Sequence, residues 1–372
     1  MAQINKPLHI TATISRVLLG LVFTFSGFVK IIDPLGTTYK IEDYLHAFGG
    51  VFISLDVLAF PAAMCLVTLE FVLGLALLLH VKPKATPFIV LAFMLAMTPL
   101  TLYLALYNPI TDCGCFGDAI VLSNWATFWK NVLLCLLLIP VFADYKNIHP
   151  IYTSPAEWGL TAILLAISLS ISTYCLRHLP LFDFRPYKVC ADIPALMEIP
   201  DDAPRPEYDV TLVYEKDGKQ QDFRLEDYPR NDTTWHFVTQ KSVLVSKGYE
   251  PPIHDFSLVT MDDGLEDITD DILSSREPVA LLIMYDLYNT NHRVLNKNLD
   301  LLKQRHGKLY AVTGSGVQAT EQFIAAHQGW DIPFLTCDPV TLKTIVRANP
   351  GVIVLQRGRI IEKYNLRDIG RQ

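Results

Sequence analysis

The chain has 372 residues, of which 51% are hydrophobic and 19% are charged, and its mean hydropathy is +0.28. So small a charged fraction is unusual for a soluble protein and indicates a membrane protein. The formal net charge is −7 and no cluster of Lys and Arg is present, which argues against binding to nucleic acid, because the phosphate backbone requires grouped basic side chains.

Five apolar stretches are long enough to cross a bilayer as helices, which takes about 20 residues each. They cover residues 10–32, 56–79, 86–107, 124–143 and 157–176. The first has a long apolar run and no small-residue cleavage site after it, so it is predicted to stay as an anchor and not to be removed as a signal peptide. The sequence therefore predicts a multi-pass membrane protein in contact with the lipid bilayer.

The connections between these stretches differ in charge. The second carries Lys82 and Lys84 and the fourth carries Lys146, whereas the first is rich in acidic residues. Because positive charge marks the cytoplasmic side, the N-terminus is predicted to be cytoplasmic, and the third connection and everything after about residue 177 are predicted to lie outside. In a bacterial inner membrane this outer side is the periplasm, where disulfides persist.

The third connection contains the sequence DCGCFGD, residues 112–118. Gly114 permits the sharp turn that a disulfide between Cys113 and Cys115 needs, and the strain of so short a ring favours its reduction, which suits a couple that passes a disulfide on. A structural zinc site generally takes four ligands and no second such motif is near, so no metal is expected. An unreactive disulfide that only staples the loop is the alternative.

Four further residues are candidates for the site: two cysteines at the outer end of the fifth stretch and two charged residues inside the membrane. Cys175 and Cys190 flank the outer end of the fifth stretch and are candidate resolving thiols for a mixed disulfide with the loop. Arg16 and Glu70 lie inside the first and second stretches, where charges are costly, and we predict that they form an intramembrane pair. Such a pair would either fix the helix register or take part in proton or quinol handling.

A proline-rich spacer from Pro180 to Pro206 ends the helical region. A small β-rich insertion follows over residues 206–250, with a hairpin predicted at Asp217-Gly218. From Pro251 onward strand and helix patterns alternate, which predicts a mixed sheet covered by helices.

Residues 251–367 resemble the thioredoxin superfamily, in its peroxiredoxin-like and TlpA-like branch. The similar segments are PPIHDFSLVT, LLIMYD, NPGVIVL and RGRI. The resemblance implies a thioredoxin-like fold in which Pro350 is the candidate cis-proline. The catalytic thiols of that family follow the central strand, but no cysteine occurs here between Tyr285 and His292. The fold is therefore expected without the dithiol chemistry, and Cys337 is expected to be a core residue.

The helical region resembles the DoxX and MauE families of redox-associated membrane proteins over about residues 10–143. The shared pattern is R-x3-G-x6-G-x2-K beginning at Arg16, then Asp33-Pro34, then E-x3-G beginning at Glu70, then DCGCFGD. The resemblance implies a four-helix membrane core and a link to disulfide formation in a periplasmic partner or to electron transfer into quinones. The fifth helix would then lead the chain outside.

Together these patterns predict an α-helical membrane bundle followed by an α/β domain with a small β-rich insertion. The expected domains are a four-helix DoxX/MauE-like domain (1–150), a fifth transmembrane helix (151–179), a spacer with the β-rich region (180–250) and a thioredoxin-like periplasmic domain (251–372). The expected function is thiol-disulfide exchange at Cys113 and Cys115, coupled to a quinone or to a periplasmic protein client. The alternative is a non-enzymatic, membrane-anchored scaffold that presents a redox-inert thioredoxin-like binding module.

Overall fold

The computed structural model describes residues 6–371 except residues 111, 206, 217, 231, 247, 262–263 and 328. Its N-terminal half is helical, with α1 (Lys6–Ile32), α2 (Pro34–Phe48), η1 (Gly50–Leu58), α3 (Ala59–Leu78), α4 (Thr86–Tyr107), α5 (Asn124–Ala143), η2 (Tyr145–Asn147) and α6 (Ser154–Arg177). Within the described ranges, five helical segments are long and apolar enough to cross a membrane: α1, η1 together with α3, α4, α5 and α6. The predicted five spans are confirmed, and the protein is a multi-pass membrane protein.

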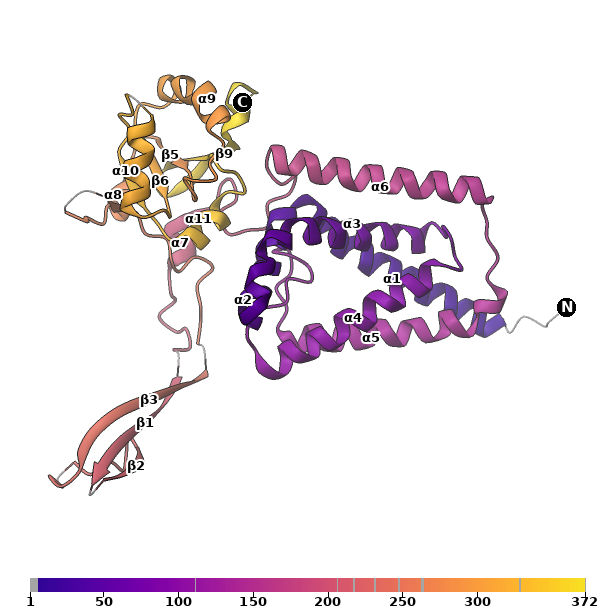
Figure 1. Ribbon diagram of the computed structural model, residues 1–372, viewed down its shortest axis with the longest axis horizontal. Coiled ribbons are helices and arrows are strands. Elements are labelled where there is room, and N and C mark those ends of the chain that lie inside the picture. Colours follow the sequence, from indigo (N-terminus) through magenta and orange to yellow (C-terminus); the bar gives the residue numbers. More distant parts are fainter. Residues whose placement is uncertain are drawn as a thin grey trace.

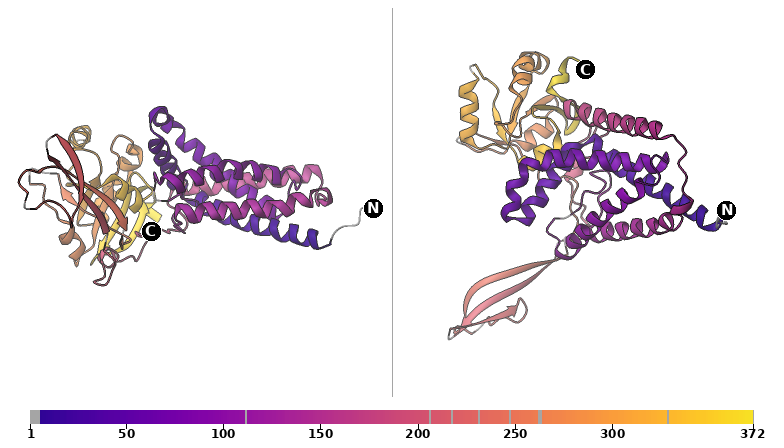
Figure 2. Two further views of the ribbon diagram at one scale, coloured as in Figure 1. Left: turned by 90° about the horizontal axis from the view of Figure 1, so that it is seen from below. Right: turned by 45° about the vertical axis from the view of Figure 1, so that its right-hand side comes forward.

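The spanning helices lie side by side, and successive helices run in opposite directions (Figures 1 and 2). The N-terminal end of α1 lies at one end of the bundle. At the other end lie α2, the loop between α4 and α5, and the C-terminal sheet domain, to which α6 leads (Figure 1). The acid-rich connection, the cysteine loop and the C-terminal domain therefore share one end of the bundle.

Close packing of α1 against α3 depends on small residues. A Cβ built on Gly27 would lie 2.5 Å from the backbone of Phe71, and one built on Gly74 would clash with the backbone of Thr24. Gly20 likewise faces Leu78, so the partners run in opposite directions along the two helices. Because glycine has no side chain, the two backbones can approach closely, as is common between membrane helices.

We expect Gly74→Ala to destabilise the bundle by about 1–3 kcal/mol, because the new methyl group would press on a backbone that cannot move without separating α1 from α3. Thermal unfolding in detergent measures the effect. The matched control is Gly159→Ala in α6, where a built Cβ has no neighbour within 4 Å and where alanine is the better helix former. Equal unfolding temperatures for the two variants would contradict the prediction.

Helix α2 lies in the first connection, where the sequence predicted no helix, because acidic and polar residues there are typical of a segment outside the membrane. Local signals account for it: Asp33 accepts a hydrogen bond from the backbone N–H of Gly36 at 3.1 Å as N-cap, Pro34 occupies the first turn, and Gly49 ends the helix with φ of 65°. This helix forms one side of the site described below.

The C-terminal half contains two sheets and short helices. Its elements are α7 (Ile193–Met197), β1 (Glu207–Lys216), β2 (Lys219–Arg224), β3 (His236–Ser246), β4 (Val259–Thr260), α8 (Thr269–Ser274), β5 (Val279–Ile283), α9 (His292–Arg305), β6 (Leu309–Thr313), α10 (Val317–Ala326), β7 (Phe334–Thr336), α11 (Pro339–Ile345), β8 (Gly351–Gln356), β9 (Arg359–Asn365) and η3 (Leu366–Arg371). The expected alternation of strands and helices after residue 251 is thus confirmed, whereas α8 and η3 were not predicted.

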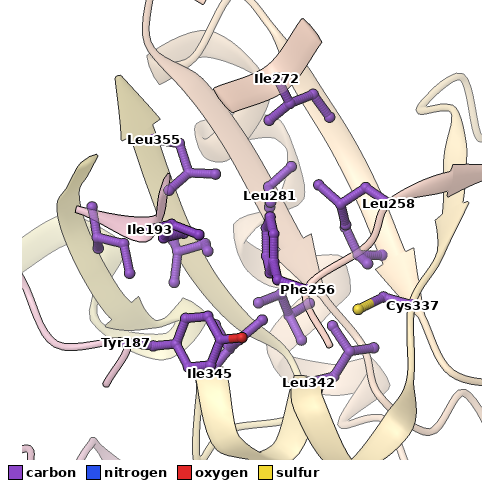
Figure 3. Close-up of a cluster of buried hydrophobic side chains, with 14 of the residues drawn as sticks. Tyr187, Ile193, Phe256, Leu258, Ile272, Leu281, Cys337, Leu342, Ile345 and Leu355 are labelled. Atoms are coloured by element: carbon purple, nitrogen blue, oxygen red, sulfur yellow. The ribbon is translucent and has the colours of Figure 1, made fainter. Parts of the chain in front are cut away.

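The larger sheet has six strands in the order β4-β7-β6-β5-β8-β9. Strands β5, β6 and β7 are parallel, whereas β4, β8 and β9 pair antiparallel with their neighbours. Side chains of β5 alternate between two cores: Leu281 packs with α7, α8 and α11 on one face, and Leu282 packs with α9 and α10 on the other. Figure 3 shows the first core, in which Cys337 is buried as predicted.

The smaller sheet has three antiparallel strands in the order β2-β1-β3 and projects away from the C-terminal domain (Figure 1). Strands β1 and β2 pair with Lys216 opposite Lys219. Asp217, at the predicted hairpin turn, lies outside the described residues. The expected β-rich insertion is therefore a separate small sheet.

Candidate functional site

The loop that carries Cys113 and Cys115 is anchored to α1 and α2 through its carbonyl groups. Tyr44 of α2 donates a hydrogen bond to the carbonyl of Cys113 at 2.6 Å, and Ser26 of α1 donates one to the carbonyl of Cys115 at 2.5 Å. Each cysteine is thus positioned by a different helix, which restricts the relative movement of the two thiols.

The turn between the two cysteines is shaped by Asp112 and Gly114. Asp112 accepts a hydrogen bond from the backbone N–H of Gly114 at 2.9 Å, and its other oxygen pairs with Lys40 of α2 at 3.1 Å. Gly114 has φ of 64°, and a Cβ built on it would lie 3.1 Å from Lys40. A larger residue would be strained in this conformation, so glycine is needed between the two thiols.

The two sulfur atoms lie 3.2 Å apart, and both cysteines are free thiols and half-buried. The hydrogen bond from the Cys113 thiol and the positive charges of Lys130 and Lys30 lower the pKa of Cys115 to about 6, against the opposing effect of burial. The hydrogen bond to Cys115 and burial raise the pKa of Cys113. At neutral pH the pair therefore contains one thiolate and one thiol.

A buried ion pair lies next to this loop, inside the bundle. Lys30 of α1 pairs with Glu70 of α3 at 2.7 Å, and these residues are only 8% and 5% exposed. Lys30 also donates to the hydroxyl of Ser26 at 3.3 Å, and Ser26 holds Cys115. A continuous polar chain thus leads from Glu70 to the cysteine loop.

The predicted pairing of Arg16 with Glu70 differs from the structure. Arg16 donates to the backbone carbonyl of Leu77, whereas Glu70 pairs with Lys30. Because α1 and α3 are antiparallel, Arg16 near the start of α1 faces the end of α3. Leu77 lies seven residues beyond Glu70, about 10 Å along the helix axis, which is more than the arginine side chain spans.

A mostly apolar cavity of about 340 Å³ lies beside the cysteine loop. Both Cys113 and Cys115 line it, together with residues of α1, α2, α3 and α4 and with the linker that follows α6. The linker contributes Phe182, Phe184 and Arg185. The cavity therefore joins the membrane-spanning helices to the two thiols, with a volume in the range of small-molecule sites.

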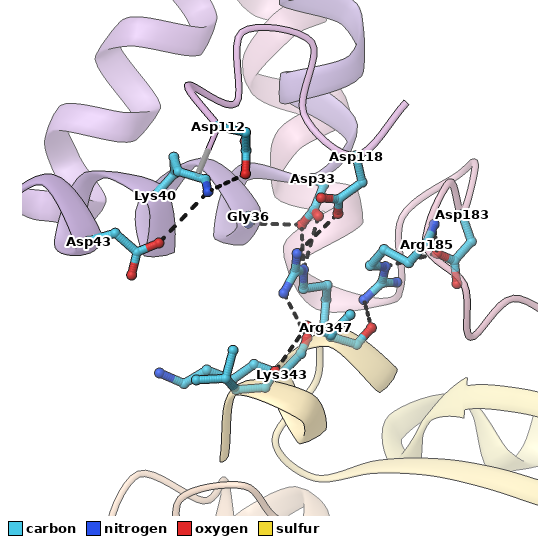
Figure 4. Close-up of polar contacts among 12 residues, drawn as sticks. Asp33, Gly36, Lys40, Asp43, Asp112, Asp118, Asp183, Arg185, Lys343 and Arg347 are labelled. Atoms are coloured by element: carbon cyan, nitrogen blue, oxygen red, sulfur yellow. Dashed lines mark hydrogen bonds and ion pairs between the residues drawn. The ribbon is translucent and has the colours of Figure 1, made fainter. Parts of the chain in front are cut away.

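The C-terminal domain contacts the rim of this site through Arg347. This side chain, in a residue that is 7% exposed, pairs with Asp33 at 2.9 Å and with Asp118 of the cysteine loop at 3.3 Å (Figure 4). Burial alone would raise the pKa of Asp33, but the charges of Arg347 and Arg185 hold it below its usual range. Burial raises the pKa of Asp118 and outweighs the opposing effect of Arg347.

The contact also involves the end of the central strand β5. Tyr285, two residues after β5, hydrogen-bonds through its hydroxyl to that of Tyr39 of α2 at 3.2 Å. The nearby peptide bond between Asn349 and Pro350 is cis, and the amide of Asn349 donates to the carbonyl of Asp286 at 2.7 Å. The end of the sheet at which β5 meets Pro350 thus faces the membrane domain.

Residues 8–143 match the model of the family described as Methylamine utilisation protein MauE. They form a MauE-family membrane domain. Residues 208–247, which comprise nearly all of the smaller sheet, match a family described as Domain of unknown function (DUF8463). No curated protein and no solved structure matches the chain.

Two side chains at the site lie outside the MauE-family domain. Arg347 comes from the C-terminal domain and Arg185 from the linker, whereas Cys175 and Cys190 lie apart from the cysteine loop. Cys175 is buried against Ile31 in the membrane, and Cys190 is exposed, with its backbone N–H bonded to Ile360. Their role as resolving thiols stays a prediction, and it requires a rearrangement that brings one of them to the loop.

Sequence reasoning missed Lys30 as the partner of Glu70, although Lys30 belongs to the pattern that suggested the family. It also missed Arg347 and Arg185. The only signal for these two residues was the group of acidic residues near the loop, which need basic partners. In the part of the chain that the structure describes, no group of three or more His, Cys, Asp or Glu side chains is placed to hold a metal ion.

Alkylation of Cys115 by iodoacetamide is expected to rise with pH around a midpoint near 6, because only the thiolate reacts and the pKa of Cys115 is lowered to about 6. Mass spectrometry of peptides after timed alkylation measures each cysteine separately. Lys130→Met should move the midpoint upward, whereas Lys146→Met, at the other end of the bundle, should leave it unchanged. A midpoint above 8 in the unaltered protein would contradict the assignment.

Proposed function

We propose that this protein performs thiol-disulfide exchange at Cys113 and Cys115, as an oxidoreductase or as an accessory subunit of one. The observation that carries the proposal is the thiol pair itself: the sulfur atoms are 3.2 Å apart and line a cavity that reaches into the membrane bundle. The low pKa of Cys115 supports it, because a thiol of low pKa is a good leaving group in disulfide exchange.

In the proposed cycle, a loop disulfide accepts two electrons from a client dithiol. A client thiolate attacks Cys113, the bond between the loop sulfurs breaks, and Cys115 leaves as the thiolate. The second client thiolate then attacks the mixed disulfide, which releases an oxidised client and a reduced loop. A quinone, or a periplasmic partner disulfide, takes two electrons from the loop; a quinone also takes two protons and becomes the quinol.

The proposed location is the bacterial inner membrane, with the N-terminus in the cytoplasm and the C-terminal domain in the periplasm. The connections that carry Lys82, Lys84 and Lys146 support this orientation, because they lie at the opposite end of the bundle from the cysteine loop. The orientation places Cys113 and Cys115 in the compartment where disulfides persist.

We further propose that residues 251–372 form a thioredoxin-like domain, that residues 180–250 form a spacer with the small sheet, that residues 151–179 form the fifth transmembrane segment, and that residues 1–150 form the four-helix core. Supporting features of the C-terminal domain are the parallel strands β5 and β6 and the antiparallel strand β8 beside them. This domain would hold or select the client for the loop.

A scaffold without redox activity is the second candidate. The absence of any cysteine from Tyr285 to His292, after the central strand, favours it. In this case the membrane helices would only anchor a binding module.

The thiol state in cells separates these two functions. Membranes are quenched with acid, free thiols are blocked, and the thiols that become reactive after reduction are labelled with a maleimide that adds mass. We expect two protected thiols in the unaltered protein and none in Cys113→Ser or Cys115→Ser. Cys65→Ser, which removes an exposed thiol of α3, is the control. A pair that is always reduced, together with partner binding that is unaffected by Cys113→Ser/Cys115→Ser, would favour the scaffold.

A further inference from the structure

Arg185 lines the cavity and has a buried donor without an acceptor. The residue is 2% exposed, its Nε donates to Asp183 at 2.8 Å, and its Nη1 donates to the carbonyl of Thr344 at 3.0 Å. Its Nη2 is buried and has no hydrogen-bond partner among the described residues. Leaving a buried donor unsatisfied is costly, and more so when the group is charged.

The surroundings of Arg185 are otherwise apolar enough for a membrane-soluble ligand. The cavity of about 340 Å³ is lined by Leu66 of α3, by Met97 and Leu100 of α4, and by the aromatic side chains of the linker. Charged residues also line it, namely Lys30, Asp33, Lys40, Asp112, Asp118 and Arg185, and each of them belongs to an ion pair. A small apolar body with a hydrogen-bonding atom suits such a lining.

The charges around Arg185 favour an uncharged ligand over an anion. The three basic side chains of the interdomain cluster are matched by three acidic ones: Arg185 and Lys363 share Asp183, and Arg347 holds Asp33 and Asp118. Lys30 is likewise paired with Glu70. No positive charge remains unpaired here to attract an anion. A neutral oxygen, by contrast, can accept a hydrogen bond from the unpaired N–H group of Arg185.

We propose that the cavity binds an uncharged apolar molecule that has a carbonyl oxygen, and that this oxygen accepts a hydrogen bond from Nη2 of Arg185. The inference deepens the proposed function and rests on it in one respect: the molecule would be the quinone that reoxidises Cys113 and Cys115. Arg185 is then a binding residue that the linker adds to the MauE-family domain.

Binding is measured by titration calorimetry on the full chain in detergent, with decylubiquinone and with decanoate as probes. Both probes are apolar and carry oxygen acceptors, but only decanoate is charged. Decylubiquinone should bind, and decanoate should bind at least about tenfold more weakly, a difference of about 1.4 kcal/mol. Stronger binding of decanoate would overturn the proposed ligand class.

Variants then test the site. Arg185→Met should weaken decylubiquinone binding by about tenfold or more, as expected for loss of a hydrogen bond from a charged group. Arg359→Met, which removes a largely exposed partner of Asp192, is the matched control and should bind normally. Leu100→Trp leaves the Arg185 contacts intact and should abolish binding by filling the cavity; it decides the question if Arg185→Met does not fold. Unchanged binding in Leu100→Trp would overturn the proposal.

Failure of the ligand site and failure of the thiol chemistry can be distinguished. Cys113→Ser/Cys115→Ser should weaken decylubiquinone binding less than Arg185→Met does, because the oxygen is held by Arg185 and serine nearly keeps the volume of the two lining side chains. Binding that persists in this variant supports the ligand site even if the thiol pair is never oxidised in cells. An oxidised pair in a protein that binds no decylubiquinone would reject the ligand site alone.

Discussion

Glu70→Leu is expected to lower the free energy of unfolding by about 3–5 kcal/mol, the largest effect that we anticipate for a single substitution in the membrane domain. The substitution removes the carboxylate that lies 2.7 Å from the ammonium group of Lys30. Because Lys30 is only 8% exposed, its charge is then buried without a partner. Unfolding in mixtures of mild detergent and dodecyl sulfate measures the change.

The double variant Lys30→Met/Glu70→Leu supplies the matched control. It replaces the ion pair with apolar side chains of similar size, so its stability should be close to that of the unaltered protein. A double variant as unstable as Glu70→Leu would show that packing, and not the unpaired charge, accounts for the loss. Conversely, a stable Glu70→Leu variant would contradict the importance of the pair.

Arg347→Met should release the C-terminal domain from the membrane domain. The substitution leaves Asp33 and Asp118 without their shared partner, and removal of one member of a buried pair costs about 3–5 kcal/mol. Faster hydrogen exchange should therefore appear in α2 and in residues 112–118, while the strands of the large sheet keep their protection.

Arg359→Met tests whether that effect is specific, because the Arg359 pair with Asp192 is largely exposed and contributes little. This variant should exchange like the unaltered protein. If Arg347→Met also exchanges normally in α2 and in the cysteine loop, the ion pairs do not hold the domains together. Arg347→Lys should restore part of the protection, because it keeps the charge but not both contacts.

The membrane spans could be predicted because an apolar run of about 20 residues is a local property of the sequence. The alternation of strands and helices after residue 251 is equally local. Helix α2 escaped prediction although Asp33-Pro34 and Gly49 are ordinary signals of its start and end. The polar residues between these signals are typical of a connection outside the membrane, and they obscured the helix.

The composition of the site depends on tertiary contacts, which one sequence does not specify. The cysteine pair stands out because its members are two residues apart. Arg347 and Asp33, by contrast, are 314 positions apart and meet only when the C-terminal domain docks. The error over Arg16 has the same origin, since the partner of Glu70 is set by the antiparallel packing of α1 on α3.

Asp33 gives the docking of the two domains a mechanical consequence. One of its oxygens accepts a hydrogen bond from the backbone N–H of Gly36 in the first turn of α2, and the same carboxylate pairs with Arg347. Helix α2 in turn carries Tyr44, which holds the carbonyl of Cys113. A client that pulls on the C-terminal domain would therefore apply force to the first turn of α2, and α2 would transmit it to the loop as a displacement of Cys113 relative to Cys115.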